Sequence, residues 1–326
     1  MRVLSSSTSR AILSLLLVVL VGVLFHADGA FYQWDTHRDM LRQISVFGIL
    51  ACGMTLVILC GGIDLSVGSL LGLTAVLFSI FSLQWAWPAL IAIPACLIVG
   101  FLLGAASGGL IARFSIQPFI ATLAMMVLAR GLAKLVSGGQ KISTAVQLQD
   151  GSYEYVEVPS LLNVLNSRVF DDNIAIVTLL LLGCIVILWI FLSLTRWGRY
   201  LYAIGGNEEA ARLSGIPVTR MKILAYASCG MFCALAGICQ AAQELQGDPE
   251  AGVGYELTAI AIVVIGGTSL RGGSGSIWLT MLGILTIGYL EKILSINAIG
   301  EETRLILSGL IIVFAVLVQR RNPKLA

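Results

Sequence analysis

Asp64 is the residue whose chemistry most needs an explanation, because this acid lies inside a long apolar region, in the run VILCGGIDLSVGS. An ionisable group in such surroundings is costly and has a structural or a functional purpose. Its carboxylate either caps the helix that follows, satisfying backbone amides freed by Gly61 and Gly62, or contacts a solute, ion or proton. The cap is favoured, since no second acid or base lies nearby in the sequence to complete a proton relay.

Catalytic and metal-binding motifs are absent from the sequence. It contains no HExxH, GxSxG or GxxxxGK[ST], and the glycine-rich GGTSLRGGSGS lacks the lysine of a nucleotide-binding loop. His26 and His37 fall at the end of the first apolar run and in the loop after it, which suits interfacial positions. The seven cysteines lie in apolar runs without a CxxC pair, which predicts buried thiols without disulfides or metal. We expect no cofactor, so any ATP must be hydrolysed by another chain.

A polar island between two long apolar runs, residues 203–222, contains the signals of a short helix with both ends specified. Asn207 is a favoured N-cap, and Glu208 and Glu209 place negative charge at the positive end of the helix dipole. Gly215 stands where a left-handed terminator is needed. A compact helix on the polar side of a membrane protein is expected to bind a partner.

The composition predicts that these segments are positioned by membrane-spanning helices. Of the 326 residues, 58% are hydrophobic and 12% charged, against about a quarter charged in a soluble protein. The net charge of +2, without a basic face, excludes nucleic acid as an expected partner. We predict an all-α polytopic membrane protein of about ten transmembrane helices, forming a single domain over residues 1–326. Residues 11–25 are predicted to be a retained span, because no clean small-residue cleavage site follows them.

The distribution of charge predicts an orientation in the membrane. Lys and Arg gather at both termini and in one set of loops, whereas acidic residues gather in the other set. The positive-inside rule therefore places both termini and a helix over residues 205–217 in the cytoplasm, and the polar loop of residues 138–172 outside. Arg130 and Lys134 are exceptions near the outer end of a span, which snorkelling or a polar pathway could explain.

Glycine-rich breaks interrupt the apolar pattern at two corresponding places, residues 61–66 and 266–275. CGGIDLSVGSLLGLTAV and IGGTSLRGGSGSIWLTML each contain a glycine pair, a polar break and a Gly-Ser that opens a new apolar helix. Paired breaks of this kind indicate a translocation path, although small-residue packing would produce a similar pattern. The residues predicted to line the path or to form the broken helices are Gly61, Gly62, Asp64, Ser66, Gly68, Gly266, Gly267, Thr268, Gly272 and Gly273.

Four stretches, in order along the chain, resemble one protein family. GMTLVILCGGIDLSVGSLLGLTAV is similar to the signature of permease subunits of monosaccharide ABC importers, the ribose, galactose and xylose class of the branched-chain amino acid/sugar permease family. The same family is resembled by IQPFIATLAMMVLARGLA, AIGGNEEAARLSGIPVTRMKILAY and ELTAIAIVVIGGTSLRGGSGSIWLTMLG, so that the likeness extends over residues 44–319. Residues 209–215, EAARLSG, resemble the EAA-x-x-x-G coupling signature of importer permeases, without its Ile-x-Leu-Pro continuation.

The resemblance implies a translocation subunit rather than an enzyme, located in the cytoplasmic (inner) membrane of a bacterium. The implied partners are a second permease subunit, a cytoplasmic ABC ATPase, an extracytoplasmic sugar-binding protein and membrane lipid. The residues implied to couple the chain to the ATPase are Gly205, Asn207, Glu208, Glu209, Ala210, Ala211, Gly215 and Ile216. Gly205, Gly206 and Gly215 are expected to let the flanks of this coupling helix hinge.

The implied solute is a simple, ribose-like monosaccharide, although related permeases for branched-chain amino acids and for a furanosyl signalling molecule share the architecture. The alternative from another class is an ATP-independent secondary transporter or channel for a small polar solute. Secondary carriers use buried titratable groups for ion coupling, and Asp64 is nearly the only candidate here. The importer subunit is therefore the favoured hypothesis.

Overall fold

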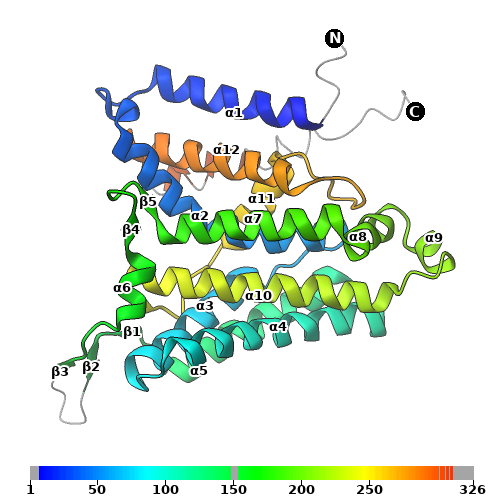
Figure 1. The fold of residues 1–326 in the computed structure, drawn as a ribbon, viewed down its shortest axis with the longest axis horizontal. Coiled ribbons are helices and arrows are strands. Elements are labelled where there is room, and N and C mark those ends of the chain that lie inside the picture. Colours follow the sequence, from blue (N-terminus) through cyan, green and yellow to red (C-terminus); the bar gives the residue numbers. More distant parts are fainter. Residues whose placement is uncertain (1–6, 148–152, 301, 305, 308, 311–326) are drawn as a thin grey trace.

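The computed structural model describes residues 7–147, 153–300, 302–304, 306–307 and 309–310, and it is built mainly of helices. The helices are α1 (Ser7–Leu24), η2 (Ala30–Tyr32), α2 (Trp34–Leu59), α3 (Val67–Ser79), η3 (Ile80–Gln84), α4 (Ala89–Phe114), α5 (Pro118–Ser137), α6 (Ser160–Asn166), α7 (Ile176–Leu194), α8 (Arg196–Gly206), α9 (Glu208–Leu213), α10 (Val218–Glu244), α11 (Tyr255–Ile265) and α12 (Ile277–Ile296). The long helices lie side by side, with α8 and α9 at one end of the molecule (Figure 1).

Six short strands gather at the opposite end, which is called the strand end below (Figure 1). They are β1 (Ile142–Ser143), β2 (Ala145–Gln147), β3 (Tyr153–Tyr155), β4 (Arg168–Val169), β5 (Ile174–Ala175) and β6 (Gln246–Gly247). They form three antiparallel pairs, β1 with β6, β2 with β3 and β4 with β5. The first pair joins the loop after α5 to the loop after α10, so chain segments about a hundred residues apart meet there, with Ile142 opposite Gly247.

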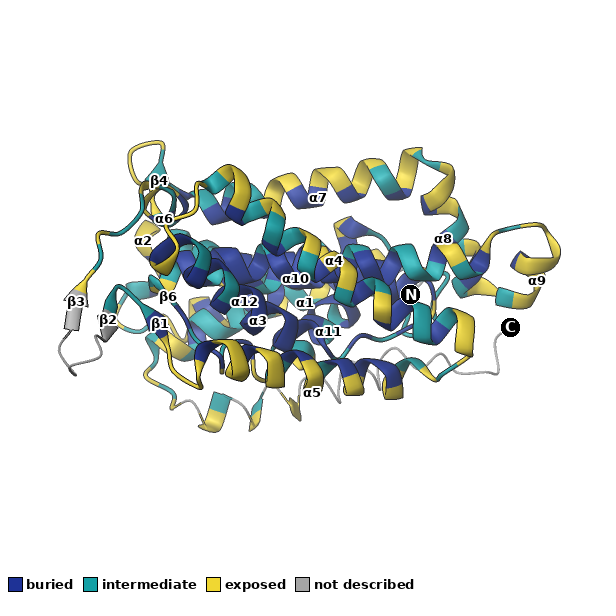
Figure 2. Cartoon of the chain, turned by 90° about the horizontal axis from the view of Figure 1, so that it is seen from below, coloured by how far each residue is buried: buried dark blue, intermediate teal, exposed yellow. Residues whose placement is uncertain are grey.

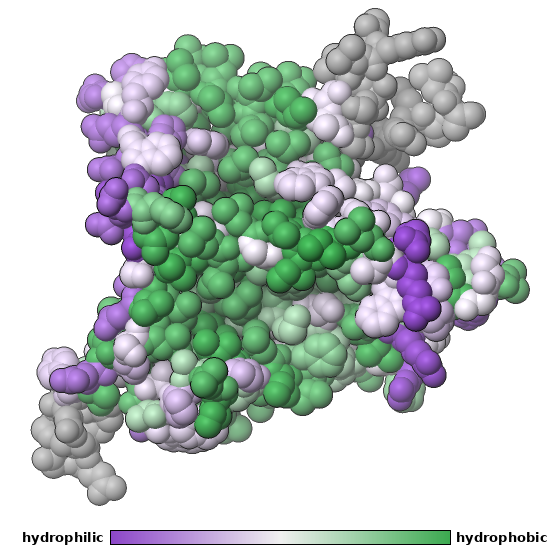
Figure 3. Space-filling model, viewed as in Figure 1, coloured by the Kyte–Doolittle hydropathy of each residue, from purple (hydrophilic) through white to green (hydrophobic). Residues whose placement is uncertain are grey.

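Membrane-spanning helices are present as the composition predicts. In the described part of the chain, seven helices are long and apolar enough to cross a bilayer. The surface shows a broad hydrophobic band between two more hydrophilic ends (Figure 3). Helix α1 falls just short of that length, α11 has only 11 residues, and the apolar run of residues 305–318, one of the spans in the predicted number, lies largely outside the described residues. The all-helical, polytopic fold is confirmed, whereas the number of about ten spans stays a prediction.

Helix α10 forms the centre of the packed core, and α3 is almost entirely buried beside it (Figure 2). Small residues on α4 let its backbone lie against α10: a Cβ added to Gly104 would collide with the carbonyl of Tyr226, and one added to Gly100 with the carbonyl of Gly230. Close backbone approach through glycine and alanine is how helices associate in lipid, where no hydrophobic force drives them together. The glycine-rich composition of α4 is thus explained by packing.

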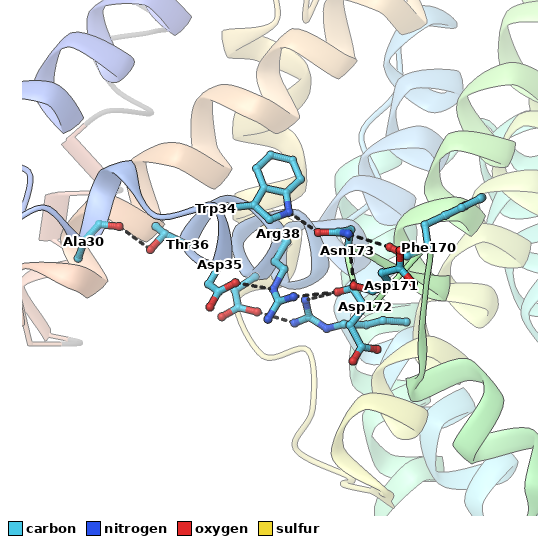
Figure 4. A network of polar contacts seen from close by, with 11 residues as sticks. Ala30, Trp34, Asp35, Thr36, Arg38, Phe170, Asp171, Asp172 and Asn173 are labelled. Atoms are coloured by element: carbon cyan, nitrogen blue, oxygen red, sulfur yellow. Dashed lines mark hydrogen bonds and ion pairs between the residues drawn. The ribbon is translucent and has the colours of Figure 1, made fainter.

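A polar network at the strand end ties the start of α2 to the β4–β5 hairpin (Figure 4). The indole Nε1 of Trp34 donates to Asn173 Oδ1 at 2.5 Å, and Arg38 donates to the carbonyl of Asp172 at 3.1 Å. Asp39 forms an ion pair with Arg168 at 2.5 Å. These contacts hold the loop of residues 167–175 against α2, so the strand end is a structured surface.

Candidate functional site

Helix α9 is built from the signals read in the sequence. Asn207 caps it, its Oδ1 accepting the N–H of Ala210 at 2.9 Å. At the other end, Gly215 adopts a left-handed φ of 81°, and the N–H of Ile216 bonds to the carbonyl of Ala211 at 3.1 Å. This is the glycine terminator expected at a helix end. Helix α9 is therefore a short, closed unit at the end of the molecule opposite the strands (Figure 1).

The two faces of α9 have different surroundings. Glu208 forms an ion pair with Lys222 of α10 at 2.5 Å, and Ala211 is 4% exposed. Glu209 and Ala210 are exposed, and the side chain of Leu213 is 84% exposed. Glu208 and Ala211 thus attach α9 to the bundle, while Glu209, Ala210 and Leu213 form a free surface. Leu213, an exposed leucine inside the polar island, was not among the predicted site residues.

Helix α8 is the main departure from the sequence-based expectation around this site. No separate helix was predicted before the coupling helix, but α8 forms there, capped by Thr195, whose Oγ1 accepts the N–H of Gly198 at 3.1 Å. Gly205 and Gly206 form its last turn. A Cβ on Gly205 would collide with the carbonyl of Leu59 and the amide of Gly273, so Gly205 is held between two backbones. The expectation of a hinge at Gly205 does not agree with this packing.

The two glycine-rich breaks meet each other at the end of α8. The N–H of Gly273 donates to the carbonyl of Leu59 at 3.0 Å, linking the second break to the end of α2. A Cβ on Gly272 would lie 2.8 Å from the amide nitrogen of Gly61 and 2.9 Å from the Cα of Gly205. We call this cluster the glycine junction; it consists of Gly61, Gly205, Gly206, Gly272 and Gly273. Tyr202 of α8 adds a hydrogen bond to the carbonyl of Gly275 at 3.0 Å.

The remaining predicted path residues also lie at close backbone contacts. Gly68, at the start of α3, touches the carbonyl of Gly252, and Gly266 touches that of Leu279 in α12. The hydroxyl of Tyr226 occupies the space beside Gly62 and donates to the carbonyl of Ile63 at 3.4 Å. Ser66 is completely buried. Gly267 and Thr268 form the first turn of the second break, and the hydroxyl of Thr268 is buried without a hydrogen-bond partner among the described residues.

Asp64 is completely buried between α2 and α3. Its Oδ1 accepts the N–H of Ser66 at 2.9 Å and the hydroxyl of Ser66 at 2.6 Å. The other carboxylate oxygen has no conventional hydrogen-bond partner in the described part of the chain. The Oδ1 atom thus closes a turn at Ser66, the N-cap residue of α3, whereas the first amides of α3 receive no side-chain cap, so the predicted cap of the following helix by Asp64 is not formed.

Exchange of Asp64 separates the hydrogen bonds to Ser66 from the negative charge. Asp64→Asn keeps an acceptor oxygen for Ser66, so we expect its thermal unfolding midpoint in detergent to stay close to that of the wild type. Asp64→Ala leaves two buried donors unpaired, which costs about 1–3 kcal/mol each, so its midpoint should fall clearly. Equal losses in both variants would show that the fold depends on the carboxylate charge and not on the hydrogen bonds to Ser66.

Arg130 and Lys134, the cations that did not fit the charge pattern, hold the loop between α10 and α11. Arg130 donates to the carbonyls of Pro249 and Ala251, the latter at 2.9 Å, and Lys134 pairs with Glu250 at 2.5 Å. Irregular backbone inside a membrane protein needs such donors, because lipid supplies none. Their position is thus explained by this loop, which they fasten against α3.

Asp248 anchors the same loop from the side of β1. Its carboxylate pairs with Lys141 at 2.9 Å and accepts the N–H of Glu250 at 2.8 Å. Burial raises the pKa of Asp248, but the Glu250 amide and the Lys141 ammonium outweigh it, and the pKa lies below its ordinary value. The carboxylate therefore stays charged at neutral pH, and its contribution to stability is lost only as the pH falls through this lowered pKa.

Comparison with known proteins assigns the architecture to a family. The family described as "Branched-chain amino acid transport system / permease component" matches residues 38–316. The ribose import permease protein of Escherichia coli strain K12 is 40% identical over 307 residues, which cover 94% of this chain and 92% of that protein. The ribose import permease protein of Bacillus subtilis strain 168 is 39% identical over 311 residues, covering 94% and 90%.

A fructose permease extends the likeness over nearly the whole chain. The fructose import permease protein of Rhizobium meliloti is 35% identical over 325 residues, covering 98% of this chain and 88% of that protein. No solved structure matches this chain. With a family match over most of its length and relatives of up to 40% identity, the chain belongs to the branched-chain amino acid transport system permease family.

Proposed function

We propose that the chain is the transmembrane subunit of an ATP-binding cassette importer that carries a simple monosaccharide across the cytoplasmic membrane of a bacterium. The curated relatives named above are import permeases for ribose and fructose, and another, from Escherichia coli strain K12, is an L-arabinose transport system permease. The apolar band and the seven long apolar helices are consistent with a multi-pass position in the membrane. The chain would work with a second permease subunit, a separate ATPase and an extracytoplasmic sugar-binding protein.

The contact of Gly205, at the end of α8, with both glycine-rich breaks is the observation that supports the proposed coupling. Helix α9 presents Glu209, Ala210 and Leu213 as a free surface for the ATPase. Immediately before α9, Gly205 touches the backbones of both breaks. Backbones in direct contact move together when one is displaced, because close packing leaves no empty space between them. A push on α9 is thus delivered to the ends of α2 and α12, which border the proposed path.

Coupling is tested by changing α9 without removing it from the membrane. We expect Glu209→Lys and Gly215→Val to lower ATP-driven sugar uptake about tenfold, while the ATPase still hydrolyses ATP. Valine at a left-handed φ costs about 1–3 kcal/mol, enough for an effect of this size. The measurement is sugar uptake per ATP hydrolysed, using the permease reconstituted in liposomes with its ATPase and binding protein.

Two conservative variants serve as controls. Asparagine tolerates the left-handed conformation, so Gly215→Asn should keep most of the uptake. Glu209→Gln keeps the size of the side chain without reversing its charge and should have a smaller effect than Glu209→Lys. Wild-type ratios of uptake to hydrolysis in both Glu209→Lys and Gly215→Val would refute the coupling role of α9. Uptake by the permease alone, without ATP, would favour the secondary transporter instead.

A further inference from the structure

A cavity of about 470 Å³ lies between α2, α11 and α12, away from the glycine junction. Helix α2 contributes Gln43 and Phe47 to its lining, and α11 contributes Tyr255 and Thr258. Gln43 is nine residues from the start of α2 at the strand end, or roughly 14 Å along the helix axis. The cavity therefore lies nearer to the strand end than to α9. None of the residues predicted to form the path lines it.

The walls of the cavity combine aromatic rings with uncharged polar groups. The rings of Phe47 and Tyr255 pack 4.3 Å apart between centroids. Gln43 and Ser295 are exposed, and Thr258 is partly exposed, so their polar groups are accessible from the cavity. This mixture of an apolar wall and a few hydrogen-bonding groups is typical of small-molecule sites, whose volumes are about 300–1,000 Å³.

The charged groups of the cavity balance each other. Glu291 of α12 and Arg304 line it together, giving one negative and one positive group. A lining without net formal charge favours a neutral solute over an anion or a cation. A sugar ring suits such a site because its hydroxyls need hydrogen bonds while its C–H faces pack on aromatic rings.

We propose that this cavity is a transit subsite for the imported monosaccharide, in which Gln43, Thr258 and Ser295 hydrogen-bond sugar hydroxyls and the Phe47 and Tyr255 rings contact the sugar ring. The subsite lies on the route from the strand end, next to the loop that Arg130 holds. This inference rests on the proposed function, because it concerns the solute that the importer moves. The subsite implies that the permease contributes to the selection of the sugar.

The test removes one hydroxyl at a time from the cavity in the complete importer. Thr258→Val and Ser295→Ala are compared with Thr122→Val and Ser107→Ala, which remove hydroxyls from α5 and α4 outside the cavity. Each variant is reconstituted in liposomes with the ATPase and the binding protein. Uptake of D-ribose, D-fructose and L-arabinose is measured per ATP hydrolysed, together with the stimulation of hydrolysis by the sugar-loaded binding protein.

We expect each cavity variant to lower the uptake of at least one imported sugar about fivefold per ATP hydrolysed, the effect of one lost hydrogen bond. Stimulated hydrolysis and the two control variants should stay within about twofold of the wild type, since the buried hydroxyl of Ser107 has no hydrogen-bond partner among the described residues and that of Thr122 bonds only to the carbonyls of Pro118 and Phe119 one turn earlier. Unchanged uptake in both cavity variants, or equal losses in the controls, would overturn the subsite. A wild-type complex that imports none of the three sugars would overturn the proposed function, and the subsite with it.

Discussion

Replacement of Gly205 with alanine is expected to lower ATP-driven sugar uptake about tenfold or more, whereas the same change at Gly206 should leave it within about twofold. A Cβ at position 205 has no space between the carbonyl of Leu59 and the amide of Gly273, so the hydrogen bond between those two groups must lengthen or α8 must move away. Overpacking of this kind costs about 1–3 kcal/mol. At position 206 a Cβ would meet no atom within 4 Å.

The two adjacent glycines make the comparison a sharp one. Both belong to the last turn of α8, so both alanine variants change helix propensity by the same amount. Uptake and ATP hydrolysis are measured in liposomes, and the amount of inserted permease is measured by gel filtration of the detergent extract. Gly273→Ala, on the opposite side of the same contact, should resemble Gly205→Ala. Full uptake by Gly205→Ala would show that backbone contact at the glycine junction is not needed for coupling.

Replacement of Arg130 with methionine is expected to give the second large effect, a clearly lower thermal unfolding midpoint and a loss of most of the uptake. The variant removes the donors of the Pro249 and Ala251 carbonyls, and each buried acceptor left unpaired costs about 1–3 kcal/mol. Methionine keeps the apolar stem of the side chain and removes the guanidinium, so the effect reports the loss of that group with its hydrogen bonds. The loop before α11, and with it the wall of the cavity at Tyr255, should lose its fixed position.

Lys134→Met is the matched control for Arg130→Met, because it changes the next cation of the same helix and the same loop. The pair between Lys134 and Glu250 is about half exposed on both sides, and exposed pairs contribute only about 0–1 kcal/mol. We therefore expect a small change in the midpoint, measured by the same thermal unfolding experiment in detergent. If both variants lost stability equally, the loop would be held by charge and not by the hydrogen bonds of Arg130.

Local signals in the sequence predicted the elements of the site well. Asn207 and Gly215 define the ends of α9 through hydrogen bonds that reach only three to five residues along the chain. Asp64 bonds to its neighbour Ser66 over the same short range, although it does not cap α3 as predicted. The glycine breaks end α2 and α11 as predicted, since glycine and polar residues end apolar helices regardless of what packs around them. Helix α8 was missed because a short amphipathic stretch after a long span reads as a loop.

Contacts between distant segments could not be read in this way. The partners of Arg130 are 119 and 121 residues away, and nothing near position 130 announces them. The sequence does not distinguish a glycine that is required for close packing from a glycine that permits bending. Only the residues packed against each glycine in the structure distinguish the two roles. Gly205, read as a hinge, is enclosed by Leu59 and Gly273, while a Cβ added to Gly206 beside it would meet no atom within 4 Å.

The sequence by itself determined a helical membrane protein, the capped helix α9, the two breaks and the resemblance to sugar permeases, because hydropathy, helix ends and motifs are properties of short stretches. Only the tertiary structure decided that the two breaks and α8 meet in one glycine junction, that Arg130 holds the loop before α11, and that a cavity with balanced charge lies between α2, α11 and α12. Each of these depends on which backbones lie against each other, and that is settled by the packing of the whole bundle.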